Sequence, residues 1–217
     1  MSAALIAAIT AKDAAKVRAV LAADPAAARA ASPDGTSLVC LAVYHGQPEI
    51  AETVAAAKGD LDIFEAAALG RTARLRELIE DDRSQLRAVA PDGFYPLGLA
   101  AYFRHQDAVR LLLDMGADVH QAASNPTKVT ALHAAVASNQ PEIVRWLVEA
   151  GADVNARQQL DYTPLMGAAA NARTEILDLL LAHGANPSLK TAEGKTAADL
   201  AREHGHGEVA DRLDGLG

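Results

Sequence analysis

The sequence repeats itself with a period of about 33 residues, and this periodicity limits the fold more than any other feature. Thr130, Thr163 and Thr196 are equally spaced at this period, and small or apolar residues follow each of them. Further along, residues 141–156 and 174–186 carry similar apolar stretches, each interrupted by Gly-Ala and then Asp or Asn. A fixed period of this length is typical of arrays in which every repeat is one small supersecondary unit.

Each unit has the sequence features of two helices. Apolar residues at helical spacing form one stripe along residues 143–148. Pro141 and Pro164 stand where a helix begins, since the first turn has no use for the missing N–H. Gly151 and Gly184 follow helical stretches, where a left-handed residue commonly caps the helix. No segment alternates long enough to predict a strand beyond short paired turns.

These segments resemble the ankyrin repeat, in which threonine-proline-leucine-histidine opens a short helix and a second helix ends in glycine-alanine-aspartate. The stretch Thr130-Ala131-Leu132-His133 carries the first motif, and Gly151-Ala152-Asp153 carries the second. The resemblance implies an all-α ankyrin-repeat solenoid of about seven helix-turn-helix units, with short extended turns between them.

The residue at the leucine position of the motif marks each unit. These markers are Ile6, Val39, Phe64, Leu97, Leu132, Leu165 and Ala198. Five of the six steps match the period to within two positions, whereas the step from Val39 to Phe64 is much shorter. We therefore predict a single domain, 1–217, divided at about 1–32, 33–59, 60–90, 91–123, 124–157, 158–190 and 191–217. Because the short step leaves no room for an extended turn, we also predict a kink near residues 58–63.

Composition and charge exclude several classes of protein. The formal net charge of −8 argues against a nonspecific nucleic-acid binder or a binder of anionic membranes. Fifty alanines favour closely packed helices. The single cysteine, Cys40, excludes an internal disulfide framework. No apolar run approaches the roughly 18 residues needed to cross a bilayer, and the first residues lack a basic flank. A cytoplasmic protein is the expectation.

No catalytic or metal-binding pattern emerges from the sequence. Cys40 stands where the ankyrin motif has histidine, so a small core residue is the favoured interpretation over a nucleophile. The resemblance implies that His133 bonds the threonine hydroxyl and nearby backbone. His204 and His206 are two residues apart, so on a helix they point to different faces. We expect no metal, no cofactor and no enzymatic activity.

The aromatic residues suggest where a partner binds. In ankyrin proteins, partners commonly contact the turn tips and two variable positions near the end of each first helix. Five of the eight aromatic residues map to such positions, and aromatic side chains are frequent in binding hot spots. The resemblance implies a noncatalytic protein–protein interaction scaffold whose predicted partner-binding residues are Tyr44, His45, Leu69, Phe94, Tyr102, Phe103 and Tyr162. The competing interpretation is that the aromatics pack between adjacent units.

Three alternatives stay open. A small-ligand protein or an enzyme would place its site in the irregular units 2–4, with Tyr44, His45, Tyr102, Arg104 and His105 around a pocket. The aromatic face could instead mediate self-association, although a monomer is expected. Residues 121–128 carry a two-residue insertion that is either a contact finger or a tolerated surface insertion.

Overall fold

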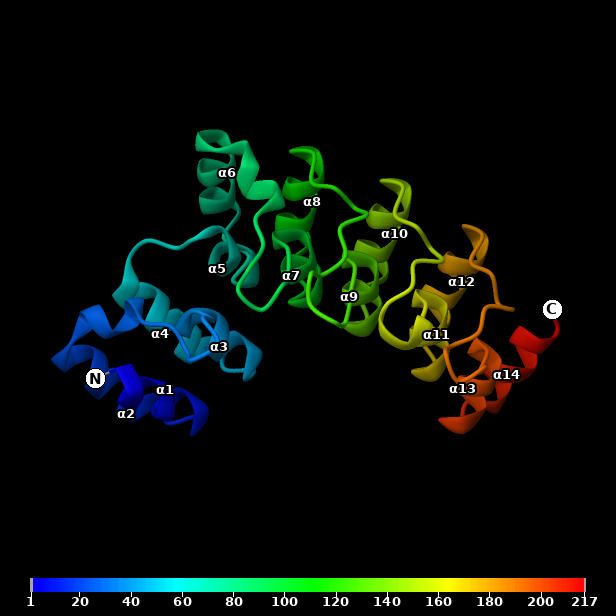
Figure 1. Cartoon of the computed structure of the whole chain (residues 1–217), viewed down its shortest axis with the longest axis horizontal. Coiled ribbons are helices and arrows are strands. Elements are labelled where there is room, and N and C mark those ends of the chain that lie inside the picture. The colour runs from blue at the N-terminus through cyan, green and yellow to red at the C-terminus, as the bar shows by residue number, and fades with distance from the viewer. Residues whose placement is uncertain (1, 217) are drawn as a thin grey trace.

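The structure, a computed structural model, describes residues 2–216 as an elongated row of helices that come in pairs (Figure 1). This part of the chain contains fourteen α-helices and no strand. The pairs are α1 (Ser2–Thr10) with α2 (Ala14–Ala23), α3 (Leu38–Tyr44) with α4 (Pro48–Lys58), α5 (Ile63–Ala68) with α6 (Thr72–Asp81), α7 (Pro96–Tyr102) with α8 (Gln106–Asp114), α9 (Ala131–Ala137) with α10 (Pro141–Glu149), α11 (Pro164–Ala170) with α12 (Thr174–Ala182), and α13 (Ala197–Glu203) with α14 (Gly207–Asp214). The predicted all-α solenoid is confirmed, while the boundaries of its units stay a prediction.

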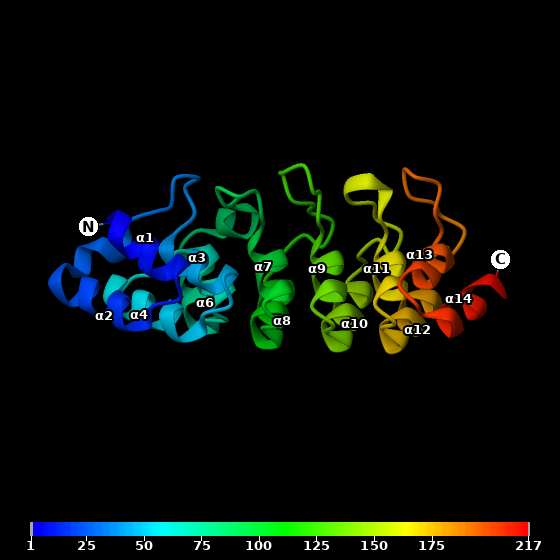
Figure 2. The same ribbon diagram turned by 90° about the horizontal axis from the view of Figure 1, so that it is seen from below.

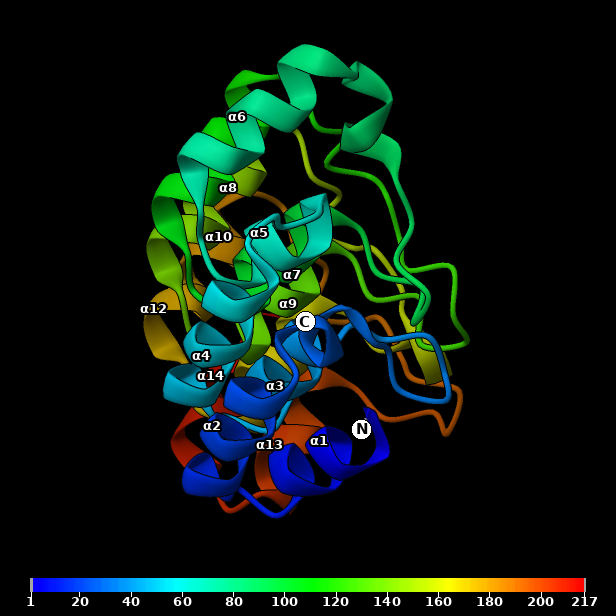
Figure 3. The same cartoon turned by 90° about the vertical axis from the view of Figure 1, so that its left-hand side faces the viewer.

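The helices and turns form three layers. The second helices, those with even numbers, lie side by side along one face, and the first helices, those with odd numbers, lie next to them (Figure 3). The turns project from the first-helix layer to one side (Figure 2). Short 3₁₀ segments complete some turns, namely η1 (Pro25–Arg29), η2 (Arg83–Arg87) and η3 (Gln159–Asp161). The row arches with the first helices on its inner side (Figure 1).

The repeated threonines begin the first helices, as their spacing suggests. The hydroxyl of Thr130 accepts the backbone N–H of His133 at 3.4 Å, and Thr196 accepts that of Asp199 at 3.2 Å. Thr163 does the same for Met166 at 3.4 Å. Each hydroxyl satisfies one of the N–H groups that a helix leaves unpaired at its start, which stabilises a helix by about 1 kcal/mol.

The core lies between the helix layers, where each unit covers the next. The markers Leu132 and Leu165 are almost completely buried, and each such leucine contributes about 2 kcal/mol through burial. Two of the predicted markers are less buried than the others. In the first and third pairs, Leu5 and Ile63 are fully buried, whereas Ile6 and Phe64 are only partly buried. The residue before the marker is also buried in the other units, as at Leu38 and Ala131, so these two units differ only in the partial exposure of the marker itself.

The chain divides into two blocks at the short step. One hydrophobic cluster runs from Leu5 to Ala55, and a second runs from Ile63 to Leu213. We call residues 2–58 the N-terminal block, residues 63–216 the C-terminal block and residues 59–62 the junction. The extended turn is missing here as predicted, and the row of helices bends between α4 and α6 (Figure 1).

The turn tips of the C-terminal block are joined to one another by backbone hydrogen bonds. The N–H of Ser124 donates to Gly93 O at 2.9 Å. The next two bonds run from Gln159 N to Thr127 O at 2.8 Å and from Ala192 N to Leu160 O at 2.9 Å. This series of bonds fixes the tips relative to the helices beneath them. It includes the insertion at residues 121–128, which bonds both neighbouring tips.

Candidate functional site

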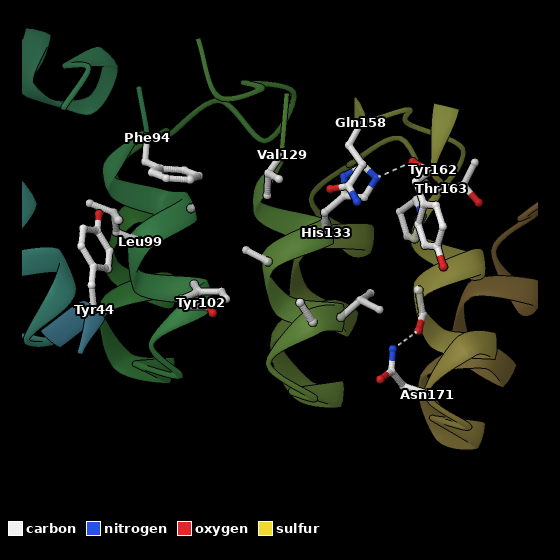
Figure 4. A pocket seen from close by; sticks show the side chains of 16 residues that line it. Tyr44, Phe94, Leu99, Tyr102, Val129, His133, Gln158, Tyr162, Thr163 and Asn171 are labelled. Atoms are coloured by element: carbon white, nitrogen blue, oxygen red, sulfur yellow. Dashed lines mark hydrogen bonds between the residues drawn. The ribbon is translucent and has the colours of Figure 1, made fainter. Parts of the chain in front are cut away.

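An apolar groove of about 570 Å³ lies on the first-helix face of the C-terminal block (Figure 4). Helices α7, α9 and α11 form its floor, and three successive turn tips form one side. It is lined by Tyr44, Phe94, Gly98, Leu99, Tyr102, Val129, His133, Ala134, Val136, Ala137, Gln158, Tyr162, Thr163, Pro164, Gly167 and Asn171.

Aromatic side chains stand at both ends of this groove. Tyr44, Phe94 and Tyr102 lie at one end and Tyr162 at the other (Figure 4). Tyr102 is 52% exposed and Tyr44 is 38% exposed, which is unusual for large side chains that have apolar neighbours. Within the described chain, none of the lining residues is Asp, Glu, Lys or Arg. The groove therefore offers an uncharged, aromatic surface to whatever enters it.

Small residues open the floor of the groove. A Cβ placed on Gly98 would meet no atom within 4 Å, so the glycine leaves space above α7. Gly98 occupies the position that carries His133 in α9, and the missing imidazole is one reason for this space. Gly167 on α11 acts similarly, although its Cβ would lie 3.4 Å from Val136 Cγ1.

His133 holds two walls of the groove together. Its Nδ1 accepts a hydrogen bond from the Thr130 hydroxyl at 2.8 Å, and its Nε2 donates to the carbonyl oxygen of Tyr162 at 3.2 Å. Burial lowers the pKa of His133 to about 4, because the charged imidazolium would lose its hydration. The ring is therefore neutral at neutral pH and fixes the tip that carries Tyr162.

Known proteins with the same repeats identify the family. Two family models match, "Ankyrin repeats (3 copies)" over residues 63–158 and "Ankyrin repeats (many copies)" over residues 147–201. Ankyrin repeat domain-containing protein 37 of Homo sapiens is 36% identical over 107 residues, which cover 49% of this chain and 67% of that protein. This chain belongs to the ankyrin-repeat family.

Other relatives share the repeats within much longer proteins. A Caenorhabditis elegans homolog of transient receptor potential cation channel subfamily A member 1 is 34% identical over 148 residues, covering 68% of this chain but 12% of that protein. Glycerophosphocholine phosphodiesterase gde1 of Schizosaccharomyces pombe is 41% identical over 98 residues, covering 42% of this chain and 9% of the enzyme. The chain thus spans about a tenth of the length of these two relatives.

Four of the seven residues predicted from the ankyrin resemblance come together in the groove, namely Tyr44, Phe94, Tyr102 and Tyr162. Phe103 is partly buried and packs against the larger core, with its ring centroid 5.2 Å from that of Tyr102 and 5.6 Å from that of Tyr44. For Phe103, the competing interpretation of packing between units describes its surroundings better.

The other two predicted residues lie away from the groove. Leu69 ends α5 and packs against the core of the N-terminal block, so it helps to join the two blocks. His45 is partly buried at the end of α3, where its backbone N–H caps the helix. Neither contributes to the surface that the aromatics form.

Sequence reasoning missed the glycine and glutamine positions of the groove. Gly98, Gly167 and Gln158 line it, although none was predicted. Gly98 and Gly167 could have been predicted from the sequence, since each is a glycine within a first helix at a position that holds another residue in neighbouring ankyrin units. The position of Gln158 could not have been predicted from the sequence. It depends on the unusual turn at Leu160 and Asp161, two non-glycine residues with left-handed φ values of 62° and 58°.

Of the residues suggested for a catalytic or ligand site, Tyr44 and Tyr102 line the groove, whereas His45, Arg104 and His105 lie outside it. His105 packs against Gly70 and its Nε2 lies 2.8 Å from Ala68 O. Cys40 is buried, which raises the pKa of its thiol to about 12. Within residues 2–216, no group of three or more His, Cys, Asp or Glu side chains is arranged to hold a metal ion. No helix in the same range has the length and apolar character required to cross a membrane.

Proposed function

We propose that this chain is a noncatalytic scaffold that binds a partner protein in the groove over α7, α9 and α11. The observation that carries this proposal is the lining itself, because exposed tyrosines and a phenylalanine surround a hollow without charged side chains. Such a surface matches an apolar, uncharged segment of a partner, which would bury aromatic area at little cost in desolvating charges.

Preorganisation of the groove supports the proposal. The tips that carry Phe94, Val129 and Tyr162 are fixed by the backbone bonds between tips and by His133. Binding therefore costs little conformational entropy on the side of this chain, and a few aromatic contacts can give useful affinity. The surface that binds is a wall of packed helices, so binding requires no rearrangement of these three units.

Family membership supports the same class of function. Ankyrin repeats are generally protein–protein interaction modules, and the family is generally non-enzymatic. The phosphodiesterase relative matches this chain over only a small share of its length. The activity in its name therefore gives no reason to propose the same reaction here.

The test uses peptide ligands selected against the full chain from a displayed library of random sequences. We expect the selected peptides to be rich in apolar residues and to bind Tyr102→Ala at least about tenfold more weakly than the unchanged protein. Val89→Ala is the matched control, since Val89 is an exposed apolar residue outside the groove. Equal affinity for all three proteins would contradict the proposal.

A further inference from the structure

The two blocks are joined by side chains and packing, without the bonds between turn tips that link the later units. No backbone hydrogen bond in the described chain connects residues 2–58 with residues 63–216, and none connects the two helix pairs inside the N-terminal block. Three such bonds link the turn tips within the C-terminal block. Instead, the Tyr44 hydroxyl donates to the carboxylate of Asp92, passing from α3 over α5 to the tip before α7. The tip at Gly35 also lies against Pro91, because the third unit has no turn of its own between them.

A small cavity marks the surface where the blocks meet. It has a volume of about 170 Å³ and is lined by residues of the N-terminal block, among them Cys40 and Tyr44, and by residues of the C-terminal block, among them Phe64 and Asp92. Cys40 is 5% exposed and belongs to neither of the two hydrophobic clusters. Its thiol is therefore covered by the meeting of the blocks and not by the interior of one of them.

The junction is a short connection that begins at a buried ion pair. Gly59 has a φ of 86°, which favours glycine, and no atom lies within 4 Å of where its Cβ would be. The next two residues are held only by exposed or partly buried side chains, since Asp60 pairs with Arg29 and Leu61 O accepts from Arg74 Nε. One residue before Gly59, Lys58 Nζ lies 2.7 Å and 2.6 Å from the two carboxylate oxygens of Glu65, which is fully buried. This ion pair holds the end of α4 against the start of α5.

We propose that residues 59–62 are a hinge about which the two blocks move apart, with the Lys58–Glu65 ion pair as the point that stays fixed. The Tyr44–Asp92 hydrogen bond, called the clasp below, keeps the two blocks together. When the hinge opens, Cys40 becomes exposed to solvent. Opening requires the loss of the clasp, of the contact between Tyr44 and Phe103 and of the packing of α3 on α5. It also requires Leu69 to leave the N-terminal cluster and Leu61 to leave one of the two clusters that it contacts, while the buried members of each cluster stay together. Local opening of this kind costs less free energy than unfolding either block.

One further side-chain link crosses between the blocks. Arg71, at the start of α6, pairs with Glu52 of α4, and both side chains are about half exposed. An exposed ion pair of this kind contributes little to stability, so it offers a weak restraint on opening. The clasp is the stronger candidate because its tyrosine also packs against Phe103.

The hinge changes the groove, because Tyr44 is both part of the clasp and part of one end of the groove. Opening moves this side chain away from Phe94 and Tyr102 and leaves that end of the groove wider. This consequence rests on the proposed function, whereas the hinge does not. The test below therefore uses the protein without any partner, so that the two proposals can fail separately.

Cys40, the single cysteine of the chain, is a natural reporter of the hinge. The experiment measures how fast an aromatic disulfide reagent modifies Cys40 in the full chain under native conditions. We expect Tyr44→Phe, which removes only the clasp hydroxyl, to raise this rate about three- to tenfold. Asp92→Asn keeps the turn bond to Phe94 N and removes the charge, so we expect a smaller rise.

Tyr102→Phe is the matched control, since Tyr102 lies on the same face and its hydroxyl makes no hydrogen bond within the described chain. Its rate should equal that of the unchanged protein. Denaturant dependence separates hinge opening from unfolding, because a local opening exposes little surface and its rate rises weakly with denaturant. Equal rates for Tyr44→Phe and Tyr102→Phe, or a slope equal to that of global unfolding, would overturn the hinge.

Discussion

His133 and Tyr162 are joined across two ankyrin units, with Nε2 of the imidazole 3.2 Å from the carbonyl oxygen of the tyrosine. The same ring accepts the Thr130 hydroxyl through Nδ1, so both nitrogens are used by the neutral form. Protonation would place a charge in a buried site and disturb the bond to Thr130.

This arrangement predicts a loss of stability in mild acid. The pKa of His133 is about 4 in the folded chain and close to 6.5 when unfolded, so the unfolded state binds the proton more tightly. The stabilisation is complete above pH 6.5 and disappears as the pH falls towards 4, by up to about 3 kcal/mol. Urea unfolding at pH 7.5 and pH 4.5 measures it. In His133→Gln, the pH dependence over this window should be smaller; an unchanged dependence would show that other groups cause it.

Alanine substitutions at the neighbouring residues Tyr102 and Phe103 should differ in their effect on the free energy of unfolding. Tyr102→Ala removes an exposed side chain and should lower the free energy of unfolding by less than about 1 kcal/mol. Phe103→Ala removes a ring that packs on the core and between two tyrosines, and should cost about 2 kcal/mol. Thermal and urea unfolding of both variants measure these two changes in stability. Equal costs would place Phe103 on the surface with its neighbour.

Gly93 is required by two independent constraints. Its φ is 91°, and a Cβ there would lie 2.8 Å from the backbone nitrogen of Asn125 in the next tip. Gly194 holds the same position in the last tip, with a φ of 83° and open space around it. Gly194→Ala should therefore cost about 1 kcal/mol and Gly93→Ala more than about 2 kcal/mol, as measured by urea unfolding. Equal losses of stability for the two substitutions would show that the tips at Gly93 and Asn125 do not approach each other this closely.

The buried ion pair at the junction predicts a large effect from one substitution. Lys58→Met leaves the carboxylate of Glu65 buried without its cation and should lower stability by about 3 kcal/mol. The double variant Lys58→Met/Glu65→Gln removes the stranded charge and should recover part of this loss. The exposed pair of Arg76 and Glu80 is the control, since Arg76→Met should change stability by less than about 0.5 kcal/mol. Similar effects at both sites would contradict the burial of Glu65.

Much of the fold could be predicted because the repeat is local. The threonine caps and the stripe of apolar residues on each helix depend on residues three or four positions apart, so spacing alone reveals them. The break between α4 and α5 was also accessible, since the short step from Val39 to Phe64 cannot hold the missing turn. The partial exposure of Ile6 and Phe64 was not, because both are apolar and only packing decides how far each is buried.

The groove was harder to predict than the fold. Tyr44 and Asp92 are 48 positions apart, and nothing in either segment indicates that they meet over α5. Tyr102 and Phe103 are adjacent aromatics whose separation into surface and core depends on where α7 ends. The aromatic content of the surface could be predicted from the ankyrin positions, whereas its full membership depends on contacts between distant units.

The most direct test of the binding surface is hydrogen–deuterium exchange of the full chain with and without a selected peptide. We predict slower exchange at the tips around residues 91–95, 127–130 and 158–163 and at the ends of α7, α9 and α11, with unchanged exchange in α8, α10 and α12. Protection concentrated on the second helices, with the groove unaffected, would contradict the account.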